Sequence, residues 1–317
     1  MQVFFDTYSQ YIIPSDTLVL AISGWVDSMV LFDMVKKHHP RERIIVAHFD
    51  HCLRWAESDW DRELVASICK SENVIFEVQK MNIAQIASDE KSSLEAIARR
   101  ERYRFLESIR AKYDARYILT AHHRDDQAET ILMNLIKGAK VRWLSGMPTL
   151  SGYVFRPLLG IAKAEILQYA WEKTTAYRED STNQDTDYTR NNIRHNIVPL
   201  LHSINPSVDE TLSDLGWYMQ ELWIFLSGYI DNWLQGAEKI SWRDQSFLIS
   251  EFVLLEEFIK REVVSTLYAR AHDDSTQWLS RGMIAEIIRF ITEGSNSHGT
   301  KEIKKLRLER KGERVYY

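Results

Sequence analysis

Short apolar runs alternate with longer segments of helical periodicity through the first 140 residues, and this pattern constrains the fold most strongly. The runs lack polar alternation, which is typical of strands buried on both faces. We expect strands at 18–22, 43–49, 74–78 and 117–120, and helices directly after the first strand, at 57–72, from Ser92 onward and at 125–137. This order predicts an α/β domain with an open parallel sheet and helices on both of its faces.

The length of 317 residues suggests a second domain. Asn205-Pro206 is the best boundary, which gives a first domain over 1–205 and a smaller, mainly helical domain over 206–317. In the second domain we expect helices at roughly 207–235, 246–269 and 280–291, and a hairpin at 304–316 around Gly312. A polar stretch at 178–192 is expected to form an active-site loop or lid.

Composition narrows the class of protein. Hydrophobic residues make up 45% and charged residues 27%, as in globular proteins. No apolar run is long enough to cross a bilayer, and residues 1–11 hold no basic residue, so neither a membrane span nor a signal peptide is expected. Cys52 and Cys69 form no framework and no closely spaced pair, which favours a reducing cytoplasm.

The charge is uneven along the chain. The net charge of −5 argues by itself against a nucleic-acid partner. Residues 99–116 and 301–317, however, each hold seven basic against three acidic residues. Taken singly, each run is better explained as a solvated face, but such local basic surfaces can bind phosphates despite an acidic total.

The segment that follows the first apolar run has the order strand, polar turn, helix. This order aims backbone N–H groups and a helix N-terminus at one anion. Ser23 and Ser28 add hydroxyl groups, and Asp27 could hold a cation beside that anion. The segment therefore suggests a phosphate site that needs Mg²⁺, although an ordinary strand–turn–helix corner explains it equally well.

A second polar segment follows the fourth expected strand. His122, Asp126 and Glu129 are spaced by four and three residues, so they can face one site. One imidazole with two carboxylates suits Mg²⁺ or a nucleotide. Helix capping by Asp125 is the alternative, and it explains only one of these residues. Ser23, His48, His51 and His122 all lie at the carboxyl ends of expected strands, the sheet edge where ligands of such folds bind.

Several segments together resemble, in order, the signatures of the tRNA(Ile)-lysidine synthetase family of PP-loop ATP pyrophosphatases. Residues 23–28 resemble Ser-Gly-Gly-x-Asp-Ser, 48–54 His-x-Asn-His-Gly-Leu-Arg, 95–103 Glu-Ala-x-Ala-Arg-x-x-Arg-Tyr, and 122–130 His-His-x-Asp-Asp-Gln-Ala-Glu-Thr. Further family blocks match at 156–159, 179–183 and 190–194. The resemblance covers about residues 17–201.

Three residues depart from the family pattern. Trp25 replaces the second glycine of the loop, Asp50 replaces an asparagine and Cys52 replaces a glycine. Glycine lets a backbone approach a phosphate closely and adopt positive φ. We therefore expect Trp25 to impair ATP binding, and a catalytically impaired tRNA-binding paralogue is the alternative function.

The resemblance implies a ligase that uses ATP to adenylate the C2 oxygen of the first anticodon cytidine of a CAU isoleucine tRNA. The ε-amine of free L-lysine then displaces AMP. A tRNA thiolase of the same fold is disfavoured because its usual Cys-x-x-Cys pair is absent. A GMP or NAD synthetase is disfavoured by the arginine-rich motifs. The second domain is expected to bind tRNA, and a homodimer is left open.

The resemblance also implies roles for individual residues. The loop residues Ser23, Gly24, Trp25, Val26, Asp27 and Ser28, together with His48, would bind the nucleotide. Asp27 and Asp126 would share Mg²⁺, and His122 would contact the nucleotide. Arg102 and Arg99 would steady the cytidine, and Asp125 or Glu129 would hold the lysine. Arg190 and Arg194 would hold tRNA or close over the site.

Overall fold

The computed structural model describes residues 2–52, 55–178, 189–237, 245–272, 279–293 and 298–317. The backbone divides into two compact units, Met1–Gln220 and Glu221–Tyr317, and the division falls within helix α11 (Val208–Ala237). The predicted boundary after residue 205 lies just before this helix, and the extent of the two folding domains stays a prediction. In the described part of the chain, no helix combines the length and apolar character needed to cross a membrane.

A six-stranded sheet forms the centre of the first unit, in the order β3-β2-β1-β4-β6-β5. Its strands are β1 Leu18–Ala21, β2 Ile44–Asp50, β3 Ile75–Lys80, β4 Tyr117–Leu119, β5 Leu150–Ser151 and β6 Val154–Phe155. All neighbouring strands pair in parallel except β5 with β6. The chain builds outward from β1 to β3 and then returns to β4 on the other side of β1. Between β1 and β4 the strand order therefore reverses, which is where ligands bind in such sheets.

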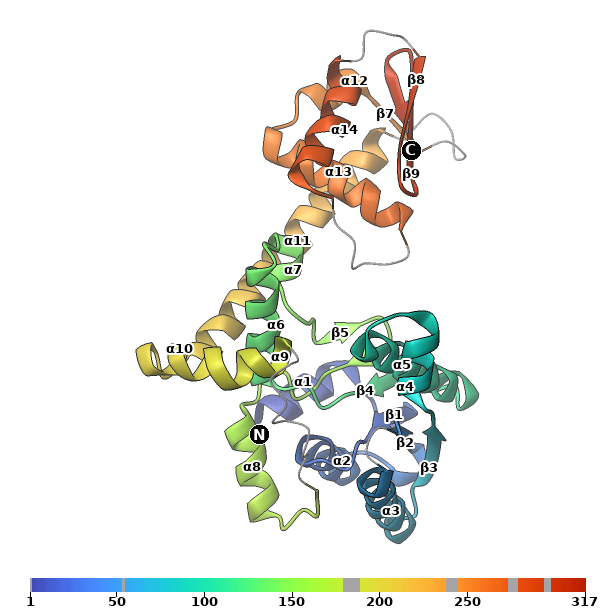
Figure 1. Cartoon of the computed structure of the whole chain (residues 1–317), viewed down its shortest axis with the longest axis vertical. Helices are drawn as coiled ribbons and strands as arrows, with labels where there is room; N and C mark the ends of the chain where they lie inside the picture. Colours follow the sequence, from blue (N-terminus) through green and yellow to red (C-terminus); the bar gives the residue numbers. More distant parts are fainter. Residues whose placement is uncertain (1, 53–54, 179–188, 238–244, 273–278, 294–297) are drawn as a thin grey trace. The chain divides into compact units, whose positions relative to one another are not determined.

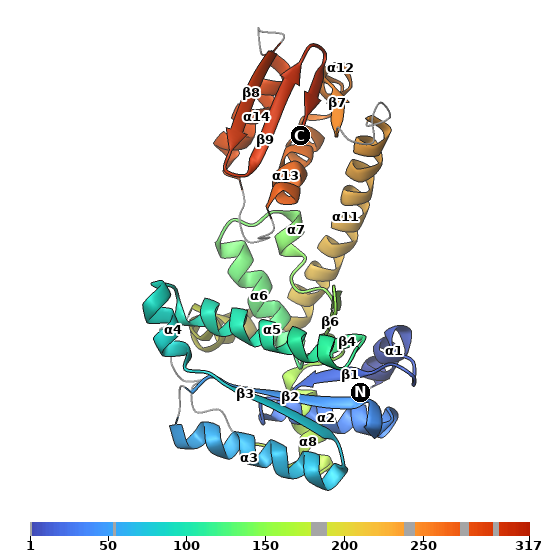
Figure 2. The ribbon, with the colours of Figure 1, turned by 90° about the vertical axis from the view of Figure 1, so that its right-hand side faces the viewer.

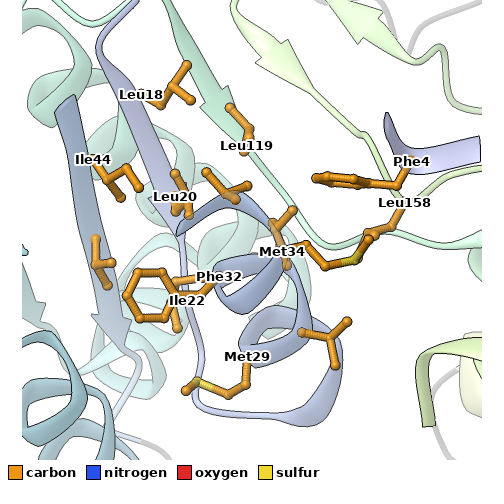
Figure 3. Packing of buried hydrophobic residues seen from close by; sticks show 14 of the residues in the cluster. Phe4, Leu18, Leu20, Ile22, Met29, Phe32, Met34, Ile44, Leu119 and Leu158 are labelled. Atoms are coloured by element: carbon orange, nitrogen blue, oxygen red, sulfur yellow. The ribbon is translucent and has the colours of Figure 1, made fainter. Parts of the chain in front are cut away.

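Helices cover both faces of this sheet, as predicted (Figures 1 and 2). The helices on one face are α1 Gln2–Tyr11, α2 Val26–His38, α3 Trp55–Glu72 and α8 Lys163–Glu172, and those on the other are α4 Ile83–Glu90 and α5 Leu94–Lys112. Side chains alternate along β1, so Leu18 and Leu20 pack against Phe32 and Met34 of α2 (Figure 3), whereas Val19 packs with Phe105 of α5. The buried strands thus fix both helical layers.

Shorter elements complete the first unit. They are a 3₁₀ turn at Arg41–Arg43, α6 Arg124–Ile136, α7 Val141–Leu144, α9 Thr189–Asn192, a π-helical turn at Ile193–Ile197 and α10 Val198–Ile204. Gln127 of α6 is fully buried and holds the loop after α7, since its amide donates to the Met147 carbonyl at 3.0 Å and accepts from the Met147 N–H at 2.7 Å. Most of the predicted lid at 178–192, including the motif at 179–183, lies outside the described residues.

The second unit combines helices with an antiparallel sheet of order β7-β10-β9-β8. Its elements after α11 are β7 Ser246–Leu248, α12 Ile249–Val253, α13 Glu257–Ala271, α14 Arg281–Glu293, β8 His298–Ile303, β9 Leu306–Lys311 and β10 Arg314–Tyr316. The hairpin around Gly312 is confirmed. A single helix over 246–269 is wrong, because Phe247 pairs with Val315 in the sheet and both side chains are fully buried.

Candidate nucleotide site

The turn between β1 and α2 is organised by one hydroxyl group. Ser28 Oγ accepts hydrogen bonds from the backbone N–H groups of Ser23 at 3.2 Å and Gly24 at 3.3 Å, and it donates to the Trp25 carbonyl at 2.9 Å. The Trp25 N–H meets Ser23 Oγ at 3.4 Å. Successive N–H groups therefore point inward to one place, where an anion's oxygens can accept the same bonds.

Trp25 itself lies in ordinary backbone conformation. Its φ of −85° and ψ of 161° are extended values, and it is the N-cap residue of α2. The positive φ in this loop, +98°, belongs to Gly24. Trp25 also forms a parallel bridge with Arg178, whose N–H donates to the Gly24 carbonyl at 3.1 Å. The loop therefore needs no second glycine for its φ, and the backbone argument for impairment by Trp25 does not hold.

Asp27 stands at the N-terminus of α2 and meets a cation from another element. The ammonium of Lys163, the first residue of α8, forms an ion pair with Asp27 Oδ1. The Lys163 N–H also donates to Asp125 Oδ1 at 2.9 Å. One residue thus joins the carboxylates at the beginnings of two helices, α2 and α6. Sequence reasoning did not single out Lys163, because a lone lysine directly after Ile161-Ala162 carries no periodic signal.

His123 brings the two predicted metal-binding carboxylates together. Its Nε2 lies 3.4 Å from Asp126 Oδ2 and 3.9 Å from Asp27 Oδ1, and its backbone N–H donates to Asp126 Oδ2 at 3.0 Å. Burial alone would lower the pKa of His123, but the charges of Asp126, Asp125 and Asp27 outweigh burial and raise it. Helical spacing singled out His122 and missed His123, because His123 caps α6.

His122 is shifted in the opposite direction. Burial and the positive charges of Arg156, Arg102 and Arg190 lower the pKa of His122 to about 3, against the opposing charge of Asp126. Its Nδ1 lies 2.9 Å from Thr120 Oγ1 at the end of β4. His122 is therefore a neutral ring at pH 7, able to exchange hydrogen bonds with a nucleotide but not to neutralise its charge.

Two arginines surround the buried carboxylate of Glu129. Arg190 Nε donates to Glu129 Oε2 at 2.7 Å, and Arg194 Nε donates to Oε1 at 2.6 Å. Arg190 Nη2 also donates to Asp126 Oδ1 at 3.0 Å. Burial would raise the pKa of Asp126, but the charges of His123 and Arg190, together with the hydrogen bond from the His123 N–H, lower it. These carboxylates and arginines, predicted for separate roles, form one network in this structure.

The predicted cytidine-binding arginines flank an aromatic ring. The guanidinium carbons of Arg99 and Arg102 lie 5.1 and 5.4 Å from the centre of the Tyr103 ring, within cation–π range. Burial, which would raise the pKa of Tyr103, is outweighed by the charges of Arg102, Arg99 and Arg156, which lower it. Burial also lowers the pKa of Arg102. Arg156, buried near the same ring, donates to the Pro148 carbonyl at 2.8 Å.

His48 is buried against the backbone just before the loop. It is 3% exposed, its Nδ1 lies 2.9 Å from the carbonyl of Ile22, and burial lowers its pKa. Farther along, Asp50 Oδ1 accepts from the Cys52 N–H at 2.9 Å, and Cys52 has a φ of +53°. Cys52 thus holds the left-handed conformation that the family's glycine would adopt freely. Residues 53–54 of this motif lie outside the described residues.

The donor set suits Mg²⁺ only in part. Within the residues that the structure describes, no three His, Cys, Asp or Glu side chains are arranged to hold a metal ion. Asp27 and Asp126 nevertheless both approach one nitrogen of His123. Mg²⁺ is commonly held by one or two carboxylates together with substrate phosphates and water, rather than by a full protein cage. Two converging carboxylates beside an anion loop fit that mode of binding.

The chain is similar to several known proteins. The model of the PP-loop domain family matches residues 3–201. A tRNA(Ile)-lysidine synthase of Bacillus thuringiensis subsp. konkukian is 39% identical over 211 residues, which are 65% of this chain and 44% of that protein. The tRNA(Ile)-lysidine synthase of Geobacillus kaustophilus is 30% identical over 286 residues, covering 88% of this chain and 62% of that protein.

The chain thus spans about half the length of the curated relatives it matches. A U34-tRNA thiolase of Methanococcus maripaludis, solved with its 4Fe-4S cluster, shares the fold at a TM-score of 0.57 and 16% identity, over 69% of this chain and 79% of that one. Because the family model covers well over half of the 317 residues, the chain belongs to the PP-loop family.

Proposed function

We propose that this protein is an ATP-dependent tRNA(Ile)-lysidine synthase. The observation that carries the proposal is the coincidence of the loop at Ser23–Ser28 with a converging Asp27–His123–Asp126 arrangement at the switch point of the sheet. The relatives at 39% and 30% identity that bear this name support the same assignment. The impaired paralogue is not favoured, because Trp25 adopts an unstrained backbone conformation.

The reaction would join lysine to a tRNA base in two steps. The C2 oxygen of the first anticodon cytidine attacks the α-phosphorus of ATP, so that an O–P bond forms and pyrophosphate leaves. The lysine ε-amine, having lost a proton, then attacks C2. The C2–O bond breaks, and AMP leaves with that oxygen.

Each of these residues would act on a different part of the substrates. The inward N–H groups of Ser23 and Gly24 would donate hydrogen bonds to the pyrophosphate portion of ATP. Bound Mg²⁺ would neutralise charge on the leaving pyrophosphate, and Asp27 and Asp126 would hold it. Arg102 and Arg99 would steady the cytidine or its phosphate, since a guanidinium makes bidentate contacts. His122, neutral at pH 7, would contact the nucleotide through hydrogen bonds.

The two candidates for the lysine-binding carboxylate, Glu129 and Asp125, both already accept hydrogen bonds within the protein. Glu129 accepts from Arg190 and Arg194, and Asp125 accepts from the Lys163 N–H. Asp125 is the better candidate, because its side chain is about one third exposed whereas that of Glu129 is 4% exposed. We propose that Arg190 and Arg194 hold the carboxylates of Glu129 and Asp126 in place.

The proposed partners are free L-lysine and the isoleucine tRNA with a CAU anticodon, in the cytoplasm. Basic residues of β9 support tRNA contact by the second unit, because Leu306 and Leu308 are buried whereas Arg307 between them is exposed. A homodimer remains a prediction.

Pyrophosphate release tests this function. With ATP and Mg²⁺ present, pyrophosphate release sustained over many turnovers should require both the tRNA and lysine, each omitted in turn. A thiolase would sustain pyrophosphate release over many turnovers without lysine, and a GMP or NAD synthetase would do so without tRNA. Either of these results, or no release at all, rejects the proposal.

A further inference from the structure

Lys163 is placed by backbone contacts that do not depend on its side chain. Its N–H is fixed to Asp125 Oδ1 at 2.9 Å, and the preceding turn is tied to α6 because the Arg124 N–H donates to the Ile161 carbonyl at 2.9 Å. Helix α8 is held to α2, since Tyr169 Oη donates to Asp33 Oδ2 at 2.9 Å. The first residue of α8 therefore keeps its place beside the loop whatever the lysine side chain does.

The ammonium of Lys163 sits on the carboxylate that the proposed function gives to Mg²⁺. It pairs with Asp27, and the side chains are 32% and 24% exposed, so water and ligands reach both. A cation cannot bind Asp27 fully while the ammonium occupies the carboxylate. An arriving triphosphate, in contrast, offers the ammonium new oxygen acceptors in the loop next to Asp27.

We propose that Lys163 is a phosphate-positioning residue whose ammonium moves from Asp27 to the polyphosphate of ATP when the nucleotide and its cation bind. Lysine suits this exchange, because its charge is compact and its four-carbon stem is flexible. The inference rests on the proposed use of ATP in this site, but it needs neither tRNA nor lysine as a substrate.

If this exchange occurs, Lys163→Met in the full chain should change the affinities for pyrophosphate and for a divalent cation in opposite directions. Without metal, inorganic pyrophosphate should bind roughly tenfold or more weakly, because one charge-assisted hydrogen bond is lost. Without phosphate, MnCl₂ alone should bind roughly threefold or more tightly, because Asp27 has lost its competing cation. Isothermal titration calorimetry measures both affinities, and electron paramagnetic resonance of Mn²⁺ checks the affinity for the metal.

Two variants make the result specific. Lys163→Arg keeps the positive charge and should retain pyrophosphate affinity within about threefold. Lys173→Met removes an exposed lysine just after the other end of α8 and should change neither affinity. Thermal unfolding confirms that each variant is folded before titration.

A structural role for Lys163 would weaken both ligands together or leave both unchanged, and either result overturns the inference. Equal loss of pyrophosphate in Lys163→Arg and Lys163→Met also overturns it. Opposite shifts in a protein that makes no lysidine would support the inference and reject the proposed function, so the two failures are distinguishable.

Discussion

Arg194 binds both carboxylate oxygens of Glu129, with Nε at 2.6 Å from Oε1 and Nη2 at 3.0 Å from Oε2. The carboxylate is 4% exposed, and the arginine, at 32%, is partly open to solvent. Removing one partner of a buried pair leaves the other charge uncompensated, which is far more costly than the pair itself is stabilising. Glu129 is therefore first a structural group in this network.

We expect Glu129→Gln to lower the free energy of unfolding by about 3 kcal/mol, because Arg190 and Arg194 lose their shared carboxylate. Urea unfolding measures this change. If Glu129 instead binds the lysine substrate, the variant will keep its stability and raise the KM for lysine alone.

Asp126→Asn tests the proposed metal site. An asparagine oxygen can still accept from the His123 N–H, so the cap of α6 is retained while the negative charge is lost. We expect pyrophosphate release to fall by about 10²-fold or more, with ATP-independent tRNA binding nearly intact. The control is Asp6→Asn, which neutralises an exposed carboxylate of α1 that accepts from the Gln2 amide, and which should retain pyrophosphate release. Wild-type turnover in Asp126→Asn, or global unfolding, would identify Asp126 as a structural cap.

Trp25→Gly addresses the departure from the family loop. Because Trp25 has a φ of −85°, glycine at this position relieves no strain. We expect ATP affinity to stay within about threefold of the wild type, under about 1 kcal/mol. Equilibrium titration with ATP decides the matter. A tenfold or greater gain in affinity would mean that the indole obstructs the phosphate pocket.

The adjacent histidines should give opposite pH dependences. The raised pKa of His123 means that its charged form stabilises the fold at pH below 6.5, and that this contribution is lost as pH rises through the folded pKa. The lowered pKa of His122 means that its neutral form stabilises the fold above pH 6.5, and that this contribution is lost as pH falls towards about 3.

Urea unfolding at several pH values measures both contributions. The stability difference between wild type and His123→Gln should shrink as pH rises above 6.5, and that for His122→Gln should shrink as pH falls below it. Parallel pH trends in the two variants would contradict the assignment of charge to His123 and neutrality to His122.

Buried strands and strand-end motifs were accessible to sequence reasoning for clear physical reasons. Continuous apolar runs such as 18–22 can be satisfied only between two helical layers, and parallel order then brings Ser23 and His122 to one edge. The spacing of Asp126 and Glu129 correctly placed them together on α6. These features depend on local periodicity, which the sequence contains directly.

What sequence reasoning missed depends on contacts between distant segments. Phe247 belongs to a strand because Val315 pairs with it, although the surrounding apolar spacing favours a helix. Lys163 reaches Asp27 across 136 residues. The ordinary φ of Trp25 likewise follows from its place as the N-cap of α2, with Gly24 taking the positive φ.

Transfer of labelled lysine to tRNA tests the central proposal most directly. The full chain would be incubated with ATP, Mg²⁺, labelled lysine and either the isoleucine tRNA with a CAU anticodon or the methionine tRNA with the same anticodon, and the labelled nucleoside would be identified after digestion. We expect label on the first anticodon base of the isoleucine tRNA and far less on the methionine tRNA. Label at the 3′ end, equal labelling of both tRNAs, or none would contradict it.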